Sequence, residues 1–193
     1  MRKWNSLKEL FTKLNELEYV ILRNHETLEE EIHAGGDIDI LCPEKAYLVE
    51  QIHADRRVLR DEVFNYFVMI EDKKIPIDIR EVGDGYYDEK WERDMLDKRV
   101  RTTEFYIMDD ENYKYSLLYH ALLHKFSIKE AYIDTLNDMF GTEIGNDDGT
   151  YKLLGNYMRK MGYMIPIPVD RGVEFNKEKY KKVCEFIELQ ERE

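Results

Sequence analysis

The chain has 193 residues, of which 43% are hydrophobic and 12% aromatic, enough for a folded core and too many for a disordered tail. Its 41 acidic and 29 basic residues leave a net charge of −12 without a basic patch, which disfavours a long nucleic-acid partner. Two cysteines without metal-like spacing, no visible signal peptide and no apolar run near the roughly 20 residues of a membrane span favour a soluble cytoplasmic protein without a membrane partner.

The first part of the chain alternates between helical and extended patterns, read from the spacing of its apolar residues. The predicted segments are a helix over 4–17, a strand over 19–22, a strand over 37–42, a helix over 44–54 and a hairpin of strands over 64–70 and 75–80. Pro43 ends the strand over 37–42, and a polar stretch lies before this strand. We expect a small mixed sheet of about four strands with flanking helices.

After residue 85 the pattern becomes mainly helical. The predicted segments are a helix over 87–98, an extended piece over 103–108, a helix from 109 or 110 to about 126, a helix over about 150–160 and a final helix capped by Asn176. Ser127 and Glu130 have the spacing of a capping box, which predicts another helix start. The predicted fold class is therefore α+β, with a catalytic core over 1–85 and a helical region over 86–193 that closes the cleft.

The most informative segment is Gly35-Gly36-Asp37-Ile38-Asp39-Ile40. Side chains alternate along a strand, so Asp37 and Asp39 share one face while Ile38 and Ile40 face the core. Two adjacent carboxylates repel each other, and a divalent cation between them would relieve this repulsion. Mg²⁺ fits such oxygen ligands best, with Mn²⁺ as an alternative, while Gly35 and Gly36 would offer backbone amides to phosphate. An acidic turn feeding a strand is the structural alternative, but it leaves Asp39 unexplained.

Asp78 is the third candidate ligand. In the segment 75–80, Ile75, Ile77 and Ile79 share one strand face, and Asp78 lies on the other with Arg80. The hairpin can bring this strand beside the strand of Asp37 and Asp39, so that three carboxylates converge. A lone Asp on a polar strand face is usually only solvated, so its candidacy depends on the other two.

A glycine-containing turn, a strand reading Asp-x-Asp and a third Asp on a later strand resemble the DNA-polymerase-β-like nucleotidyltransferase superfamily. The resemblance covers roughly residues 19–81. It implies that Asp37 and Asp39 hold the metal ions, and that Asp78 ligates the catalytic metal and helps to deprotonate the acceptor hydroxyl. It also implies ATP or another nucleoside triphosphate as substrate, with in-line attack on the α-phosphorus and release of pyrophosphate.

The resemblance has one departure, because members often carry Gly-Ser directly after the first strand. Here the sequence reads Leu22-Arg23-Asn24. Arg23 is a candidate for the triphosphate contact, since its guanidinium matches phosphate oxygens, and pairing with a nearby Glu is the alternative. Pro76 within a strand also implies an edge or a bulge.

The segments 22–24, 35–39 and 119–125 are similar to those of uncharacterised bacterial nucleotidyltransferases found near surface-polysaccharide genes. This similarity implies a small-molecule acceptor, either a sugar or a sugar phosphate. His120, His124 and Lys125 lie on the predicted helix that ends near 126, and they are candidates to line the nucleotide cleft. Histidines hydrogen-bonded at a helix interface are the alternative; a zinc pair lacks both the Glu of His-Glu-x-x-His and a third ligand.

Two other functions compete with this interpretation. A nucleotide-sugar glycosyltransferase also uses an Asp-x-Asp motif, but usually after a nucleotide-binding half of roughly 100 residues, whereas here the motif begins at residue 37. A catalytically inactive nucleotide-binding regulator is the second alternative. The missing Gly-Ser favours it, and the presence of all three carboxylates opposes it.

Overall fold

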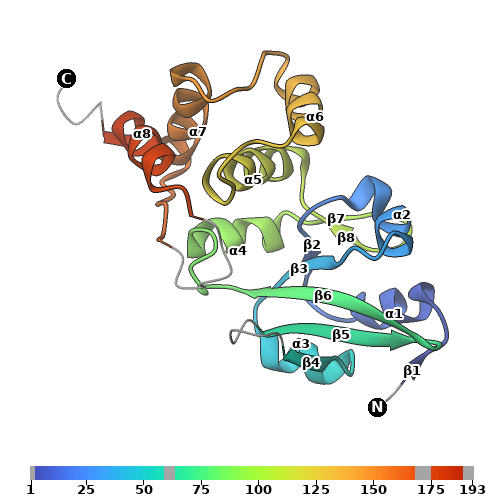
Figure 1. Cartoon of the computed structure of the whole chain (residues 1–193). Helices are drawn as coiled ribbons and strands as arrows, with labels where there is room; N and C mark the ends of the chain where they lie inside the picture. Colours follow the sequence, from blue (N-terminus) through green and yellow to red (C-terminus); the bar gives the residue numbers. More distant parts are fainter. Residues whose placement is uncertain (1–2, 59–63, 168–174, 189–193) are drawn as a thin grey trace. The chain divides into compact units, whose positions relative to one another are not determined.

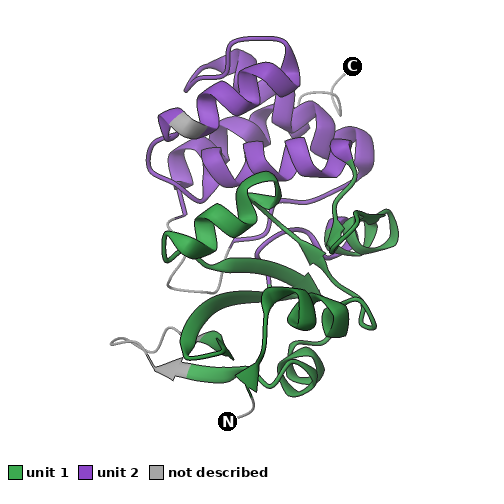
Figure 2. Ribbon diagram, turned by 90° about the vertical axis from the view of Figure 1, so that its right-hand side faces the viewer, with its two compact units in different colours: residues 1–84, 92–109 green, residues 85–91, 110–193 purple. Residues whose placement is uncertain are grey.

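The computed structural model describes residues 3–58, 64–167 and 175–188. These residues form two compact units, the first comprising residues 1–84 and 92–109 and the second residues 85–91 and 110–193 (Figure 2). Each unit contains segments from two separate stretches of the chain. We describe each unit by itself.

The first unit is built on a mixed sheet of eight strands (Figure 1). The strands are β1 (Lys3–Trp4), β2 (Val20–Ile21), β3 (Ile38–Cys42), β4 (Asp55–Val58), β5 (Phe64–Ile70), β6 (Lys73–Glu81), β7 (Val100–Arg101) and β8 (Tyr106–Ile107). Their order is β1-β5-β6-β3-β2-β8-β7, and β4 pairs with residues 64–67 of β5. The mixed sheet agrees with the sequence analysis, but four two-residue strands raise the strand count above the expected four.

Strand β3 lies at the centre of this sheet. It runs parallel to β6 and antiparallel to β2, while β6 forms the expected hairpin with β5. Ile38 and Ile40 pair in register with Ile77 and Ile79, and all four are buried. These isoleucines fix the apolar face of the sheet, so the residues that alternate with them project from the opposite face.

Three short helices of the first unit supply the rest of this core: α1 (Leu7–Leu14), α2 (Leu28–His33) and α3 (Lys45–Gln51). Ser6 caps α1, because its hydroxyl accepts a hydrogen bond from the Glu9 amide at 3.2 Å. Apolar residues of all three helices pack in one cluster with the sheet isoleucines. A 3₁₀ turn, η1 (His25–Thr27), leads into α2.

Helix α4 (Glu89–Asp97) has residues in both units, since the boundary falls between Trp91 and Glu92. The second unit otherwise contains α5 (Asp110–Leu123), α6 (Glu130–Phe140), α7 (Asp148–Met161) and α8 (Lys177–Glu188). Trp91 is fully buried within this unit, and its ring packs against Tyr119, Tyr157 and Tyr163. A helical second half therefore agrees with the sequence analysis. Among the described residues, no helix is both long and apolar enough for a membrane span.

Several local predictions differ from the structure. The segment 4–17 divides into β1 and the shorter α1, and α5 ends three residues before the expected position. The capping box at Ser127 is wrong, because α6 begins at Glu130 after Lys129 and has no side-chain cap. The cap at Asn176 is confirmed, since its side-chain oxygen accepts from the Lys179 amide at 3.1 Å.

Candidate functional site

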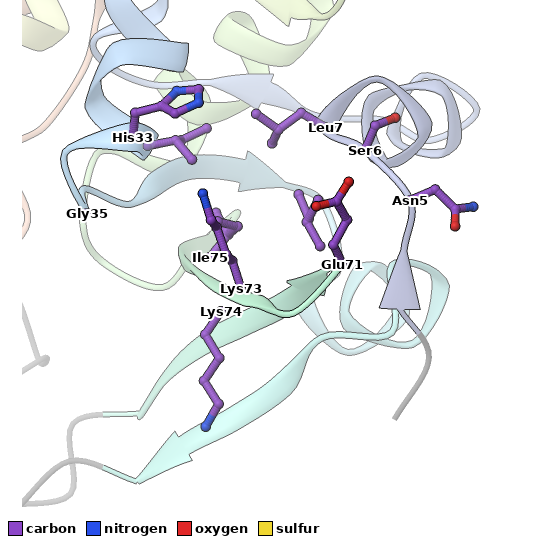
Figure 3. Close-up of a pocket in the computed structure, with 11 residues that line it drawn as sticks. Asn5, Ser6, Leu7, His33, Gly35, Glu71, Lys73, Lys74 and Ile75 are labelled. Atoms are coloured by element: carbon purple, nitrogen blue, oxygen red, sulfur yellow. The ribbon is translucent and has the colours of Figure 1, made fainter.

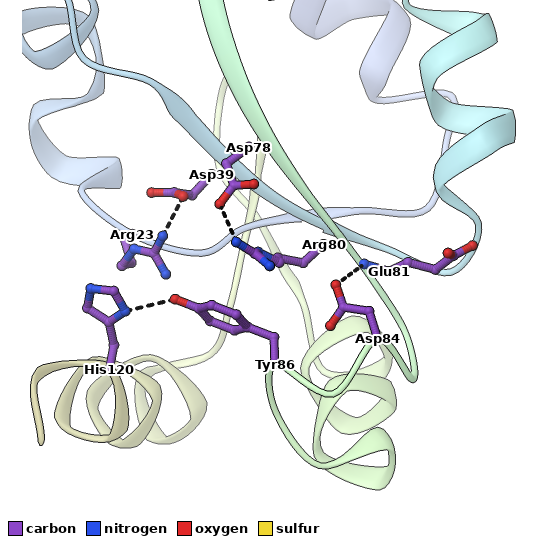
Figure 4. A network of polar contacts seen from close by, with 8 residues as sticks. All are labelled: Arg23, Asp39, Asp78, Arg80, Glu81, Asp84, Tyr86 and His120. Atoms are coloured by element: carbon purple, nitrogen blue, oxygen red, sulfur yellow. Dashed lines mark hydrogen bonds and ion pairs between the residues drawn. The ribbon is translucent and has the colours of Figure 1, made fainter. Parts of the chain in front are cut away.

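The carboxylates of Asp39 and Asp78 lie side by side in the first unit (Figure 4). The two residues are register partners on the parallel strands β3 and β6. Register partners on adjacent strands project from the same face, and this face is opposite to the one that buries the isoleucines. The alternation of residues along two strands therefore positions both carboxylates.

An arginine faces each of these carboxylates. Arg23 follows β2, the other neighbour of β3, and its Nη2 donates to an oxygen of Asp39; both residues are 8% exposed. Arg80 lies two residues after Asp78 on β6, and its Nη2 donates to Asp78 Oδ2 at 3.0 Å. The sequence analysis offered Arg23 a phosphate or a Glu as partner, whereas its partner here is Asp39.

Burial and neighbouring charges of both signs act on Asp39. Burial raises the pKa of Asp39 to about 6, the Arg23 guanidinium lowers it, and the charges of Asp37 and Asp78 raise it again. Arg80 acts in the lowering direction as the smallest of these effects. The charges of Asp37 and Asp78 therefore oppose ionisation of Asp39, and the two guanidinium groups favour it.

Asp37 lies just before β3 and is exposed. It is preceded by the turn that joins α2 to β3, where Gly35 has a positive φ of 86°. A Cβ on Gly36 would lie 2.9 Å from the Glu31 carbonyl oxygen, so the close passage of the chain requires glycine. The Gly35 and Gly36 amides donate to Ile32 and Glu31 carbonyls at 3.1 and 2.8 Å, so in this conformation both amides are used within the turn.

The donor set has the chemistry that Mg²⁺ prefers, because it consists of carboxylate oxygens on two adjacent strands. In the described ranges, no group of three or more His, Cys, Asp or Glu side chains is already arranged around a metal position. The oxygens of Asp39 and Asp78 are directed at guanidinium groups (Figure 4). The backbone places the carboxylates of Asp39 and Asp78 on one face of the sheet, but each carboxylate is paired with an arginine.

His120 and His124 lie in the second unit, on and just after the last turn of α5, and both are buried. The Tyr86 hydroxyl is 2.8 Å from His120 Nδ1, and the His124 ring packs edge-on against Tyr86 with centroids 4.3 Å apart. The hydrogen bond of His120 fits the structural alternative of the sequence analysis, whereas His124 lies among aromatic rings. Lys125 follows and is partly exposed.

The first unit also contains a pocket of about 530 Å³ beside Gly35 (Figure 3). Ile32 and Ile75 contribute buried apolar surface, and the Lys73 side chain extends across it toward His33, whereas that of Lys74 points away. Lys73 and Ile75 alternate with Asp78 along β6, so this pocket lies on the opposite face of the sheet from the carboxylates.

The sequence analysis did not assign a role to Arg80. A signal for it existed, because Arg80 has the i+2 spacing from Asp78 that places both on one strand face. No such signal existed for the pairing of Arg23 with Asp39, since it depends on β2 lying next to β3.

Comparison of the chain with protein-family models found no match, and searches of curated proteins and of solved structures found none either. The family resemblance therefore depends on the residues described above and on their positions in the sheet.

Proposed function

We propose that the chain is a magnesium-dependent nucleotidyltransferase of the DNA-polymerase-β-like superfamily, which transfers a nucleoside monophosphate from a nucleoside triphosphate to an acceptor hydroxyl. The register of β3 and β6 carries this proposal, because it sets Asp39 beside Asp78. Asp37 adds its charge to the same field. The family motif needs this grouping of two residues from one strand and one from another.

The repulsion that Asp37 and Asp78 exert on a charged Asp39 supports a cation at this place. Asp37, Asp39 and Asp78 would hold Mg²⁺ or Mn²⁺, a hard cation that takes a few carboxylates and completes its shell with water and phosphate oxygens. When bound, this ion would neutralise charge on the triphosphate and on the departing pyrophosphate.

Arg23 and Arg80 have a second role in this proposal. Once the carboxylates hold the cation, each guanidinium would exchange its carboxylate for phosphate oxygens, which match its planar set of donors. Such an exchange gives each of the two guanidinium groups an anionic partner in both the loaded and the unloaded protein. Arg23 would then replace the contact that the missing Gly-Ser makes in other members.

In the reaction, the acceptor oxygen forms a bond to the α-phosphorus while the bond from that phosphorus to pyrophosphate breaks. Asp78 would take up the hydroxyl proton of the acceptor. A net charge of −12 favours a small acceptor over nucleic acid, and we propose a sugar or sugar phosphate. Both cysteines are free, which is compatible with the proposed cytoplasmic location.

The test is pyrophosphate release from each of the four common nucleoside triphosphates with Mg²⁺ and a panel of sugar and sugar-phosphate acceptors. We expect Asp37→Asn and Asp39→Asn to lower turnover by about 100-fold or more, as loss of several kcal/mol of charge stabilisation requires. Asp78→Asn should lower turnover more than nucleotide affinity. Asp72→Asn, an exposed carboxylate on the same hairpin, is the matched control and should retain full turnover.

A second function, a catalytically inactive nucleotide-binding regulator, is favoured by the two arginine pairs, which satisfy Asp39 and Asp78 without a metal. Nucleotide binding at equilibrium, unaffected by Mg²⁺ and without pyrophosphate release for any acceptor, would establish this regulator and exclude the enzyme. Transfer of the sugar from a nucleotide sugar to the same acceptors, assayed in parallel, would instead establish the glycosyltransferase.

A further inference from the structure

The pocket of about 530 Å³ beside Gly35, which we call the hairpin pocket, has no part in the proposed transfer reaction (Figure 3). It lies between the β5–β6 hairpin, the beginning of α1 and the end of α2, and all its lining residues belong to the first unit. Small-molecule sites commonly have volumes of about 300–1,000 Å³, so this space suits a small ligand. None of the three carboxylates of the candidate site lines it.

The interior of the hairpin pocket is apolar. Four aliphatic residues line it, namely Leu7, Ile32, Ile70 and Ile75. Ile32 and Ile75 belong to the buried core of the first unit, and Leu7 and Ile70 pack against that core. Because core packing fixes these side chains, the pocket presents a preformed apolar surface on which the apolar part of a ligand can lie.

The polar residues on the helix side of the pocket already have partners within the protein. Asn5 Nδ2 donates to Glu9 Oε2 at 2.8 Å, and Ser6 Oγ accepts from the Glu9 amide. His33 Nδ1 donates to the Glu29 carbonyl at 2.6 Å. The charged residues of the hairpin are therefore the groups most available to a ligand.

Two of these charged residues, Lys73 and Glu71, line the pocket, and among the described residues neither side chain has a hydrogen bond or an ion pair. Figure 3 shows both side chains on the pocket side of the hairpin, Lys73 directed toward the end of α2 and Glu71 toward the beginning of α1. Asp72, which lies between them in the sequence, pairs instead with Lys3 at 2.7 Å. Two opposite charges therefore line one apolar pocket without pairing with each other.

We propose that the hairpin pocket binds a zwitterionic apolar amino acid, free or within a dipeptide, whose carboxylate pairs with Lys73 and whose ammonium group pairs with Glu71. The apolar side chain of the ligand lies on the aliphatic lining. Such a ligand compensates both charges at once, and its apolar body excludes water from them, which strengthens each pairing. A ligand with a single charge would leave either Lys73 or Glu71 without a counter-charge. This site does not depend on the proposed transferase activity.

Calorimetric titration of the full chain with leucine, leucyl-leucine and truncated analogues of leucine tests the proposal. Isocaproate lacks the ammonium group of leucine, isoamylamine lacks its carboxylate, and glycine lacks its apolar side chain. We expect leucine or leucyl-leucine to bind at least about fivefold more tightly than every analogue, because each analogue loses one of the contacts named above. The tighter of the two shows whether the ligand is the free amino acid or the dipeptide.

Lys73→Met and Glu71→Gln each remove one of the two charges. Each should weaken the tighter ligand by about fivefold or more, and Lys73→Met should also reduce the preference for leucine over isoamylamine, since it removes the partner of the carboxylate. Lys74→Met is the matched control, because the Lys74 side chain points away from the pocket, with its Nζ 4.7 Å from the centre of the Phe67 ring (Figure 3). This control should change the affinity by less than about twofold.

Thermal melting without ligand separates binding from folding. Lys73, Glu71 and Lys74 are all exposed, so the three variants should melt together with the native chain. Equal affinity of the native and Lys73→Met chains for the tighter ligand would overturn the proposal. So would equal binding of leucine and isoamylamine, or no binding of leucine and leucyl-leucine at millimolar concentration.

Discussion

At the scale of single residues, Arg23 and Asp39 form a buried ion pair in which each charge needs the other. Removing Arg23 leaves the Asp39 carboxylate buried on the polar face of the sheet, next to the charges of Asp37 and Asp78. We expect Arg23→Met to lower the free energy of unfolding at neutral pH by about 3 kcal/mol. The measurement is urea denaturation without added metal.

The double variant Arg23→Met/Asp39→Asn is the decisive control. It removes both charges together, so it should unfold at a higher urea concentration than Arg23→Met alone. Lys13→Met breaks the more exposed pair with Glu16 and should cost less than about 0.5 kcal/mol. Equal losses for Arg23→Met and Lys13→Met would contradict a buried charge coupling at the site.

The buried thiol of Cys42, the last residue of β3, should make the folded chain less stable as the pH becomes alkaline. Burial raises the pKa of its thiol from 9.0 to about 12, so the folded chain keeps a proton that the unfolded chain releases above pH 9.0. The free energy of unfolding should therefore fall as the pH rises from 9.0 toward 12, by at most about 1.4 kcal/mol per pH unit.

Urea denaturation of the native chain and of Cys42→Ala at about pH 8 and about pH 10 tests this. Tyr19 also has its pKa raised by burial, from 10.0 to about 12, so it begins to contribute near pH 10.0, and it does so equally in both chains. The native chain should lose more stability between the two pH values than Cys42→Ala. An identical loss would mean that the folded thiol ionises as readily as the unfolded one.

At the scale of elements, Gly155 determines how closely α7 and α8 approach. A Cβ at this position would lie 2.8 Å from Phe186 Cβ and 2.9 Å from the Val183 carbonyl oxygen. In an isolated helix, Gly→Ala would be favourable by about 1 kcal/mol, but overpacking in a closed interface costs about 1–3 kcal/mol. We expect Gly155→Ala to be destabilising overall in a thermal or urea melt.

Lys152→Ala serves as the comparison for Gly155→Ala, because Lys152 is exposed on the same helix. Its change in stability should stay within about 0.5 kcal/mol of the native chain. A Gly155→Ala variant that melts at or above the native temperature would show that the two helices can separate without cost.

The sequence predicted best those elements whose own residues show a strand alternation or a helix cap. The alternation at 75–80 and the cap at Asn176 are local signals, and the structure has β6 and α8 at these places. Helix α2 has only Leu28 and Ile32 buried among acidic residues, too few apolar positions for a helical period. Strand β4 begins with Asp-Arg-Arg and depends on pairing with β5, which no local pattern reveals.

The candidate site, like the elements, was predictable only where a local sequence pattern determines a residue's position. Alternation along each strand was enough to place Asp39 and Asp78 on the polar face of the sheet. Their counter-charges were not predictable, because the position of Arg23 depends on the pairing of β2 with β3. Nor could spacing alone reveal that the rings of residues 86, 87 and 119 surround His124, or that the rings of residues 86 and 132 contact His120.

At the scale of the whole molecule, the two units are joined by more than a linker. The chain passes from one unit to the other three times, and one of these passages lies inside α4. An isolated helix of this length does not persist in water, so α4 needs the packing that each unit gives to its own part. Unfolding of either unit would therefore leave one part of α4 without its packing, residues 92–97 in the first unit or residues 89–91 in the second.

The two tryptophans allow this coupling to be measured, since Trp4 belongs to the first unit and Trp91 to the second. Both are buried, and their indole nitrogens donate to the Ile52 carbonyl and to Asn112 Oδ1 at 3.0 and 2.9 Å. In Trp4→Phe the fluorescence reports the second unit, and in Trp91→Phe it reports the first, while far-UV circular dichroism reports both. We expect the fluorescence and dichroism transitions in urea to coincide within each variant, because a shared helix makes unfolding a single cooperative step. If the fluorescence midpoint departed from the dichroism midpoint in either variant, the units would unfold independently and α4 would not couple them.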